Sequence, residues 1–209
     1  ELIKLTNQHP RVEILQPGPG VGGHCIAVDP WFIIDKNPEL TKVIKASRER
    51  NISKEKWTYE KIISSLDDKN NQITIYGLSF KPNTDDSREA PSLVVINELT
   101  KQGATISAYD PQATKAAQQL FKQNNSINFC HSSSETVQQA DALIIVTEWL
   151  EFRSPDFTKL ANTLKDQAIF DGRNLYHPEQ VARYGLDYLC IGRPQVTKTS
   201  IQQEHTAMV

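Results

Sequence analysis

A cysteine, a histidine and an aspartate follow a cluster of glycines near the start of the chain. The segment is PGPGVGGHCIAVDPWF, residues 17–32, and it places Cys25 two residues after Gly23 and Asp29 four residues after the cysteine. A glycine-rich loop lets backbone N–H groups approach a ligand without side chains in the way. A thiol beside such a loop, a titratable His24 and a helix start is a candidate nucleophile, because these surroundings favour the thiolate. The structural alternatives are an N-cap for Asp29, a loop hydrogen-bonder for His24 and simple packing for Cys25.

The same glycines match the spacing of a dinucleotide-binding fingerprint. Gly18, Gly20 and Gly23 stand at G-x-G-x-x-G spacing, and the VEIL that precedes them could form the strand of such a site. The fingerprint also needs a long uninterrupted helix, whereas Pro30 comes seven residues after Gly23. No following stretch supplies a βαβ unit with a ribose-binding acid. We therefore predict that this run of glycines does not bind a dinucleotide.

The composition argues against several classes of protein. A net charge of −2 over 209 residues gives no broad cationic field for nucleic acid or for a membrane surface. No apolar run reaches the ~20 residues that cross a bilayer. Three widely spaced cysteines fit neither a disulfide framework nor a zinc site, which favours a reducing cytoplasm and predicts no metal. Cys130 and Cys190, at the ends of β-like runs, are predicted to be buried apolar residues.

Residues 1–66 are predicted to be the end of a mostly helical central domain. The chain opens without an initiator Met on a sequence typical of a helix already under way, so we expect that the start of a longer protein is absent. Asp29 and Pro30 can begin a helix as its N-cap and first residue, and residues 38–66 place apolar side chains at mostly helical spacing. That helix has no core of its own, so it must pack on the missing part of the protein or on another subunit.

Residues 67–193 are predicted to be an α/β domain. After the turn-rich DDKNN, short β-branched and aromatic runs alternate with helical segments. We expect six strands, in ITIYGLSF, TISAYD, INFC, ALIIVT, AIFDG and DYLCIG. This alternation predicts a Rossmann-like parallel sheet with helices on both faces, whose ligands gather at the carboxyl ends of the strands. Residues 194–209 have little periodic apolar content and are predicted to be a disordered tail.

Several long ordered motifs resemble those of the UDP-glucose/GDP-mannose dehydrogenase family. Residues 17–32 are similar to the active-site segment of UDP-N-acetylmannosamine dehydrogenases. Four further segments resemble the nucleotide-sugar-binding domain of bacterial UDP-glucose 6-dehydrogenases: YGLSFKPNTDDSREAPS, YDPQA, VTEWLEFRSPDF and FDGRNLY. The resemblance implies oxidation of the C6 hydroxyl of a UDP-sugar to the uronic acid with two NAD⁺, for surface polysaccharide biosynthesis. It also implies a thiohemiacetal and then a thioester on one cysteine, which keeps the aldehyde from escaping.

The resemblance assigns the catalytic and loop residues. Cys25 matches the family's nucleophile, and Asp29 matches the carboxylate that assists proton transfer and positions water. Gly22 and Gly23 match the turn that encloses the sugar. Where UDP-glucose enzymes carry a serine before the cysteine and a lysine before the aspartate, this chain has His24 and Val28, which favours an N-acetylated hexosamine over glucose as the sugar.

The resemblance also assigns residues of the second part. Phe80 and Lys81 match substrate contacts, Arg173 matches an arginine that binds the nucleotide sugar, and Arg88 matches one directed at the NAD cofactor. The alternatives are solvated loop charges for Lys81 and Arg88, paired with neighbouring aspartates, and a strand-end cap for Arg173. Trp149 and Phe152 within these motifs are predicted to be core or hinge packing.

The family's amino-terminal NAD-binding domain, with its own fingerprint and a catalytic lysine, has no counterpart in this sequence. We therefore expect this chain alone to bind a UDP-sugar without oxidising it, and to form a homodimer through the central helix as the family does. The alternatives are a non-catalytic UDP-sugar-binding fragment, and an ordinary Rossmann-like cofactor domain that binds NAD⁺ more tightly than UDP.

Overall fold

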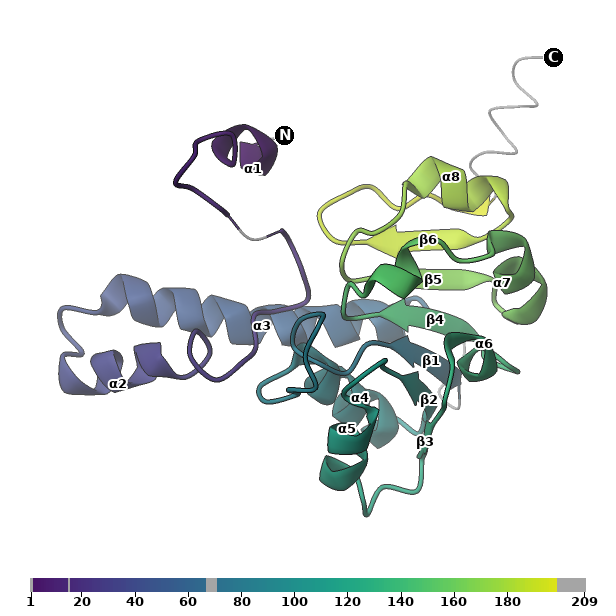
Figure 1. Ribbon diagram of the computed structural model, residues 1–209, viewed down its shortest axis with the longest axis horizontal. Coiled ribbons are helices and arrows are strands. Elements are labelled where there is room, and N and C mark those ends of the chain that lie inside the picture. The colour runs from purple at the N-terminus through teal and green to yellow at the C-terminus, as the bar shows by residue number, and fades with distance from the viewer. Residues whose placement is uncertain (1, 15, 67–70, 199–209) are drawn as a thin grey trace.

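Six parallel strands form one sheet in the order β3-β2-β1-β4-β5-β6 (Figure 1). The strands are β1 (Gln72–Tyr76), β2 (Thr105–Tyr109), β3 (Ile127–Phe129), β4 (Ala142–Ile145), β5 (Ala168–Asp171) and β6 (Asp187–Cys190). The structure is a computed structural model that describes residues 2–14, 16–66 and 71–198. Every predicted strand is present, and the chain crosses from one half of the sheet to the other after β3. The topological switch point, where such sheets bind ligands, therefore lies between β1 and β4.

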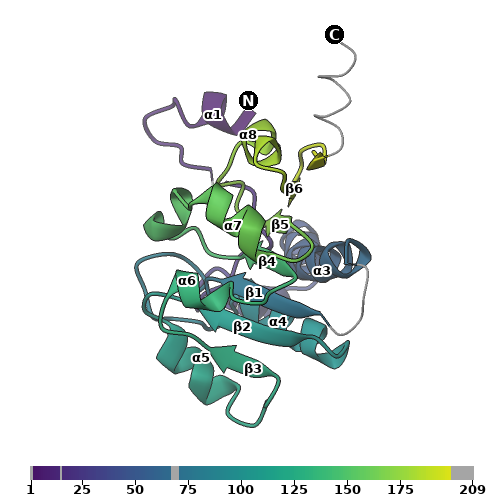
Figure 2. The ribbon, with the colours of Figure 1, turned by 90° about the vertical axis from the view of Figure 1, so that its right-hand side faces the viewer.

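Helices cover both faces of the sheet, which confirms the predicted Rossmann-like class. They are α4 (Pro91–Lys101), α5 (Thr114–Leu120), α6 (Ser133–Thr136), η1 (Leu150–Arg153), α7 (Phe157–Thr163) and α8 (Pro178–Arg183). Side chains of α4 and α5 share one apolar cluster with the end of α3 (Lys42–Ser64), and α7 and α8 contribute to a second cluster. Figure 2 shows α6 and α7 on one side of the strands and α3 on the other.

Strand β1 shows why these runs are rich in β-branched and apolar residues. Ile73 and Ile75 belong to the first cluster and Tyr76 to the second, and all three side chains are buried. Successive residues of a strand point to opposite faces, so a strand covered on both faces buries side chains on both. The one polar side chain among the buried residues of β1, Thr74, donates its Oγ1 hydrogen to the Thr136 carbonyl at 2.7 Å. The sequence read as continuous β-branched runs for this reason.

The amino-terminal part is helical, with α1 (Leu2–Thr6), α2 (Asp29–Lys36) and the long α3. In Figure 1, α2 and the first half of α3 project away from the sheet, whereas the end of α3 lies against it. Ile62 of α3 is only 2% exposed and packs in the first cluster. The second half of α3 therefore packs on the sheet of this same chain, whereas the sequence predicted packing on the missing part of the protein or on another subunit; for the first half of the helix that expectation stays a prediction.

Three local expectations differ from the structure. The N-cap of α2 is Val28 and no side chain caps the helix, so Asp29 is its first residue and Pro30 its second. The described part of VEIL is not a strand. Residues 194–198 were expected in a disordered tail, but Val196 pairs with Tyr188 in an antiparallel bridge and the Lys198 N–H donates to Asp187 Oδ1 at 2.8 Å.

Residues 199–209 of the expected tail, and 67–70 of the expected domain boundary, lie outside the described residues. The division into residues 1–66 and 67–193 stays a prediction. Among the described helices, none is long and apolar enough to cross a membrane.

Candidate active site

The glycine loop packs directly on the sheet domain. A Cβ on Gly18 would lie 2.6 Å from Nη1 of Arg173, and one on Gly22 would lie 2.2 Å from the carbonyl oxygen of Glu89. Gly23, at φ +91°, would bring a Cβ to 2.9 Å from the Phe80 ring. Gly22 needs glycine because the Glu89 backbone leaves no room for a Cβ, and Gly23 needs it because of its positive φ; at Gly18 the contact is with the end of the Arg173 side chain. The loop therefore joins the cysteine segment to Phe80 and Arg173 within one chain.

Cys25 stands at the end of this loop, where α2 begins. Its carbonyl accepts hydrogen bonds from the N–H groups of Val28 at 3.0 Å and Asp29 at 2.8 Å, which places Asp29 one turn along from the thiol. Cys25 is exposed, whereas Cys130 and Cys190 are buried as predicted. Burial raises the pKa of both buried thiols. Cys25 is thus the thiol that reagents and ligands in solution can reach.

A charged junction holds the cysteine loop against the segment before α4. The Gly23 N–H donates to the Arg88 carbonyl at 3.0 Å, and Nη2 of Arg88 lies 2.7 Å from Asp86 Oδ2. The hydrogen bond from Arg88 is the main reason that the pKa of Asp86 falls to about 2. His24 Nδ1 lies 3.2 Å from Arg88 Nη2 and 3.4 Å from Asp86 Oδ2.

This junction bears on the predicted role of Arg88. The arginine is exposed and paired with Asp86, as the solvated-charge alternative expected, and the hydrogen bond and charge of Asp86 are the main causes that raise its pKa. Arg88 therefore stands between the cysteine loop and solvent. Its predicted role toward the cofactor is compatible with this place and stays a prediction.

Arg173 follows β5 and reaches under the glycine loop. Its Nε donates to the Val146 carbonyl at 2.6 Å and its Nη2 to the Phe80 carbonyl at 3.4 Å. Nε also lies 3.0 Å from Glu148 Oε2, but Glu148 Oε2 is buried and makes no hydrogen bond, because Nε already donates to Val146. Burial lowers the pKa of Arg173, and Glu148 and Asp171 oppose that shift. The guanidinium is thus fixed by Nε and Nη2, and its Nη1 lies against Gly18 of the loop.

Phe80 and Lys81 lie in the loop that follows β1, at the carboxyl edge of the sheet. Phe80 is half-buried against Gly23, and Lys81 is exposed with its Nζ 5.4 Å from the centre of the Phe80 ring. The structure thus brings Gly22, Gly23, Phe80 and Arg173 into one packed group. Lys81 stands at its margin, and its predicted contact with substrate stays a prediction.

Asp110, at the end of β2, was missed by the sequence reasoning. Its Oδ2 accepts hydrogen bonds from the N–H groups of Leu78 at 2.8 Å and Ser79 at 3.1 Å. It also accepts from Nε1 of Trp149 at 2.9 Å, so Trp149 is a buried core residue as predicted. Thr147 Oγ1 donates to the Ser79 carbonyl at 2.6 Å. These bonds fix the two residues that precede Phe80, and only the YDPQA motif hinted at Asp110.

Glu55 of α3 lies beneath the loop, with its Cγ 2.9 Å from where a Cβ of Gly20 would stand. Partial burial raises its pKa from the ordinary 4.5 to about 7; the nearby Glu89 adds to the rise and Arg48 opposes it. The unfolded chain releases this proton near pH 4.5 and the folded chain near pH 7. Folding is therefore progressively disfavoured as pH rises between these values.

We expect Glu55→Gln to remove that pH dependence. Wild type should lose about 1 kcal/mol of unfolding free energy between pH 5 and pH 8 through this group, after discounting for its partial exposure to solvent. The glutamine variant should be more stable than wild type at pH 8 by that amount and equal to it at pH 5. Urea unfolding at both values measures the difference. Glu60→Gln on the exposed side of α3 is the matched control, and an identical pH profile for Glu55→Gln and wild type would contradict the prediction.

The described residues contain no group of three or more His, Cys, Asp or Glu that could hold a metal ion.

The prediction that the glycine run is no dinucleotide site has physical support. Its glycines are packed against Arg173, Glu55, Glu89 and Phe80, so the loop offers no open cradle for a pyrophosphate.

Several known proteins are similar to this chain. UDP-N-acetyl-D-mannosamine dehydrogenase of Methanococcus vannielii is 34% identical over 92% of the chain and 44% of its own length. UDP-glucose 6-dehydrogenase of Rhizobium meliloti is 33% identical over 87% of the chain and 42% of its own length. The structure of the UDP-N-acetylmannosamine dehydrogenase of Pyrococcus horikoshii matches with a TM-score of 0.75, at 28% identity, over 92% of this chain and 43% of that one. The chain thus spans less than half the length of the relatives it matches.

Two parts of one family are recognised along the chain. Residues 74–178 match the UDP binding domain of the UDP-glucose/GDP-mannose dehydrogenase family, and residues 1–53 match that family's central domain. The chain therefore belongs to the UDP-glucose/GDP-mannose dehydrogenase family.

Proposed function

We propose that this chain is the part of an NAD-dependent nucleotide-sugar 6-dehydrogenase that binds a UDP-sugar and presents the catalytic thiol. The product is the uronic acid, formed by oxidation of the C6 hydroxyl of UDP-N-acetylmannosamine or UDP-glucose. The observation that carries the proposal is the packing of the glycine loop. It places Cys25 at the end of a loop that already touches Phe80 and Arg173 at the carboxyl edge of the sheet.

The chemistry of the thiol follows from the reaction. Loss of one hydride and one proton from the C6 alcohol gives an aldehyde. The Cys25 thiolate adds to its carbonyl carbon and the carbonyl oxygen takes up a proton, which gives a thiohemiacetal. Loss of a second hydride and proton gives a thioester. Water then attacks the thioester carbon, the C–S bond breaks, and the acid leaves with the thiol restored. Asp29, one turn from Cys25, is placed to accept the protons and to orient that water.

NAD⁺ supplies the hydride acceptor when bound. The glycine run does not form a site for it, because its glycines are packed and the described residues 12–14 before it form no strand. We propose that a separate amino-terminal NAD-binding domain, present in the whole enzyme, holds the cofactor, with Arg88 directed at it across the cleft. The chain alone then binds the UDP-sugar without oxidising it.

The substrate is bound by a small number of groups. The half-buried ring of Phe80 supplies an apolar face, and Lys81 and Arg173 supply cations for the diphosphate and sugar oxygens. His24 and Val28 flank the thiol and favour the N-acetylated sugar over glucose. The relatives named above include enzymes of both kinds. The role in polysaccharide biosynthesis and the cytoplasmic location stay predictions.

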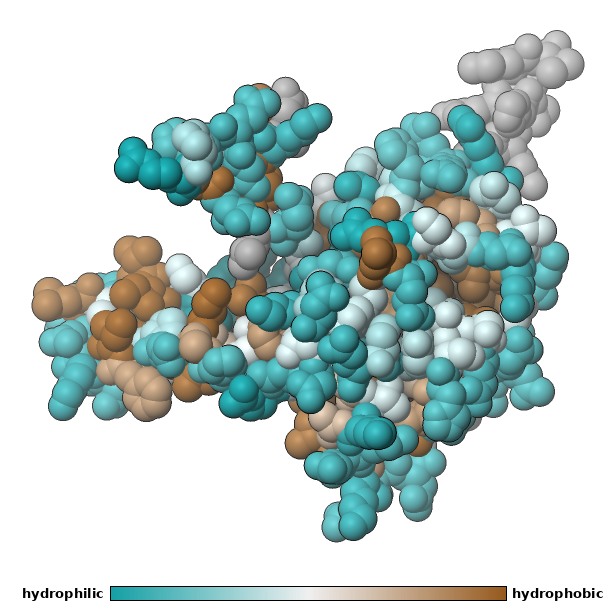
Figure 3. All heavy atoms as spheres, viewed as in Figure 1, coloured by the Kyte–Doolittle hydropathy of each residue, from teal (hydrophilic) through white to brown (hydrophobic). Residues whose placement is uncertain are grey.

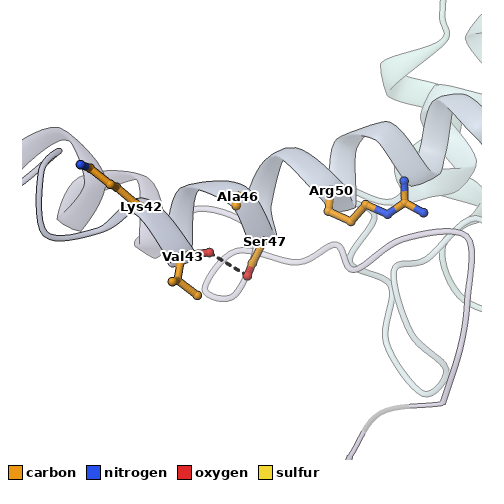
Figure 4. A pocket seen from close by; sticks show the side chains of 5 residues that line it. All are labelled: Lys42, Val43, Ala46, Ser47 and Arg50. Atoms are coloured by element: carbon orange, nitrogen blue, oxygen red, sulfur yellow. Dashed lines mark hydrogen bonds between the residues drawn. The ribbon is translucent and has the colours of Figure 1, made fainter.

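A homodimer through the central helix is part of the proposal. Figure 3 shows hydrophobic residues gathered over α2 and the first half of α3. The exposed apolar side chains there include Phe32, Ile33, Leu40, Val43 and Ile52. Figure 4 shows a groove on the surface of α3 lined by Lys42, Val43, Ala46, Ser47 and Arg50. Exposed apolar surface of this extent supports burial against a second copy.

Ligand binding and thiol labelling test the proposal on the chain itself. Calorimetry should show that UDP binds more tightly than NAD⁺. Iodoacetamide under native conditions should label Cys25 and spare the two buried cysteines. Saturating UDP-glucose should slow the labelling by about tenfold, because the sugar covers the sulfur, whereas UDP alone should protect little.

The outcomes separate the alternatives. Tighter binding of NAD⁺ than of UDP would overturn the proposal in favour of an ordinary cofactor domain. Binding of UDP-glucose with no protection of Cys25 would favour a non-catalytic UDP-sugar-binding fragment.

A further inference from the structure

The side chain of Asn51, on α3, pairs with the backbone of the glycine loop. Its Oδ1 accepts from the Val21 N–H at 2.8 Å, and its Nδ2 donates to the Val21 carbonyl at 3.2 Å. One amide thus satisfies both backbone groups of one loop residue, as a neighbouring strand would. Asn51 is half-buried, so these bonds are partly sheltered from water.

The polar groups around Asn51 form a stripe along α3. Arg48, Asn51 and Glu55 follow one another at i, i+3 and i+7, which places them on one face of the helix. Glu55 Oε1 accepts from Asn51 Nδ2 at 3.4 Å, which helps to fix the orientation of the amide. Arg48 is 8% exposed, and within the described chain its Nε has no hydrogen-bond partner. Asn51 and Glu55 of this stripe both contact the glycine loop, at Val21 and Gly20.

The loop is held from its opposite side as well. The Gly23 N–H donates to the Arg88 carbonyl at 3.0 Å, and Gly22 lies against the Glu89 carbonyl. Val21, bonded to Asn51, directly precedes these two glycines. A glycine-rich backbone has many accessible conformations, so contacts on both sides are needed to select one. The thiol follows only four residues after Val21.

We propose that Asn51 is the positioning residue of the thiol loop: its amide fixes Val21, and thereby sets where Cys25 stands relative to the sugar bound at Phe80 and Arg173. This rests on the proposed function, since it concerns the same site. Asn51 does not touch the reacting atoms. It acts through the loop backbone, and it links α3 to the site at the carboxyl edge of the sheet.

Thiol labelling of three variants tests the proposal. Asn51→Ala removes both hydrogen bonds, Asn51→Asp keeps an acceptor for the Val21 N–H alone, and Ser53→Ala changes an exposed side chain of the same helix that bonds only to the Arg50 carbonyl. The measurements are the iodoacetamide rate of Cys25 across pH 6 to 9, its protection by saturating UDP-glucose, the calorimetric affinity for UDP, and the melting curve.

We expect Asn51→Ala to lose nearly all of the roughly tenfold protection, because two hydrogen bonds correspond to about that change in a local equilibrium. The pH profile of labelling should also shift. The affinity for UDP should stay within about threefold, and melting should remain cooperative. Asn51→Asp should retain part of the protection and Ser53→Ala all of it.

Unchanged protection and an unchanged pH profile in folded Asn51→Ala would overturn the inference. A fall of UDP affinity in Asn51→Ala as large as its loss of Cys25 protection would also overturn the inference, because it would indicate a general structural role for Asn51. If UDP-glucose does not protect wild type, the proposed function fails instead. The labelling rate of Cys25 without ligand then tests the role of Asn51. A several-fold difference between Asn51→Ala and wild type supports the positioning role, and equal rates overturn it.

Discussion

Replacing Asp110 with asparagine is expected to lower the free energy of unfolding by about 3 kcal/mol or more. Both carboxylate oxygens accept hydrogen bonds: Oδ1 from the N–H groups of Gln112 and Ala113, and Oδ2 from Leu78, Ser79 and Trp149. Either orientation of an amide would turn an NH₂ group toward donors. Asp110 is 2% exposed, so water cannot replace the lost acceptor.

The same change should weaken the site. Asp110 fixes Leu78 and Ser79, which directly precede Phe80 and Lys81, so these two residues lose their anchor even where the variant still folds. Urea unfolding measures the stability, and calorimetry with UDP at low temperature measures the binding. We expect UDP affinity to fall by about tenfold, comparable to the loss of one or two well-placed contacts.

Asp156→Asn is the matched control for Asp110. Asp156 is an exposed N-cap whose side chain accepts from the Lys159 N–H at 2.9 Å, and asparagine caps helices about as well as aspartate. Its unfolding free energy should change by less than about 0.5 kcal/mol. If Asp110→Asn were as mild as this control, the carboxylate would not be what holds the β1 loop.

The sheet could be predicted because its cause is local. Runs such as ALIIVT are buried on both faces, and continuous apolar character is visible without knowing any contact. The signal from Pro30 is equally local. A proline at the second position of α2 indicates where that helix begins, and its place in the sequence argues against a dinucleotide-binding fingerprint. The buried states of Cys130 and Cys190 followed from their places at strand ends.

The anchoring residues could not be predicted because their roles arise between distant segments. Thr147 bonds to Ser79, and Asn51 bonds to Val21, only after the chain has folded. In the sequence, Asn51 is one polar residue among many on a charged helix, and nothing in its neighbours marks it. Val196 is similar: its segment lacks apolar periodicity, yet it pairs with Tyr188 at the edge of the sheet.

The second large effect is expected at Arg173. Arg173→Met keeps much of the side-chain length and removes the guanidinium, and we expect the affinity for UDP to fall by about a hundredfold. The side chain is mostly buried with its Nε fixed on the Val146 carbonyl, so the remaining donors are oriented before a ligand arrives. Pre-oriented charged donors contribute more to binding than mobile surface charges, because less side-chain entropy is lost.

The variant also changes stability, which must be separated from binding. Removing the cation leaves Glu148, whose side chain is 30% exposed, without its partner at 3.0 Å, at a cost of about 1 kcal/mol. The double variant Arg173→Met with Glu148→Gln removes the stranded charge and should recover most of the unfolding free energy. It should not recover the affinity for UDP. A folded Arg173→Met variant that binds UDP within about threefold of wild type would show that this arginine caps the end of β5 and does not bind the nucleotide.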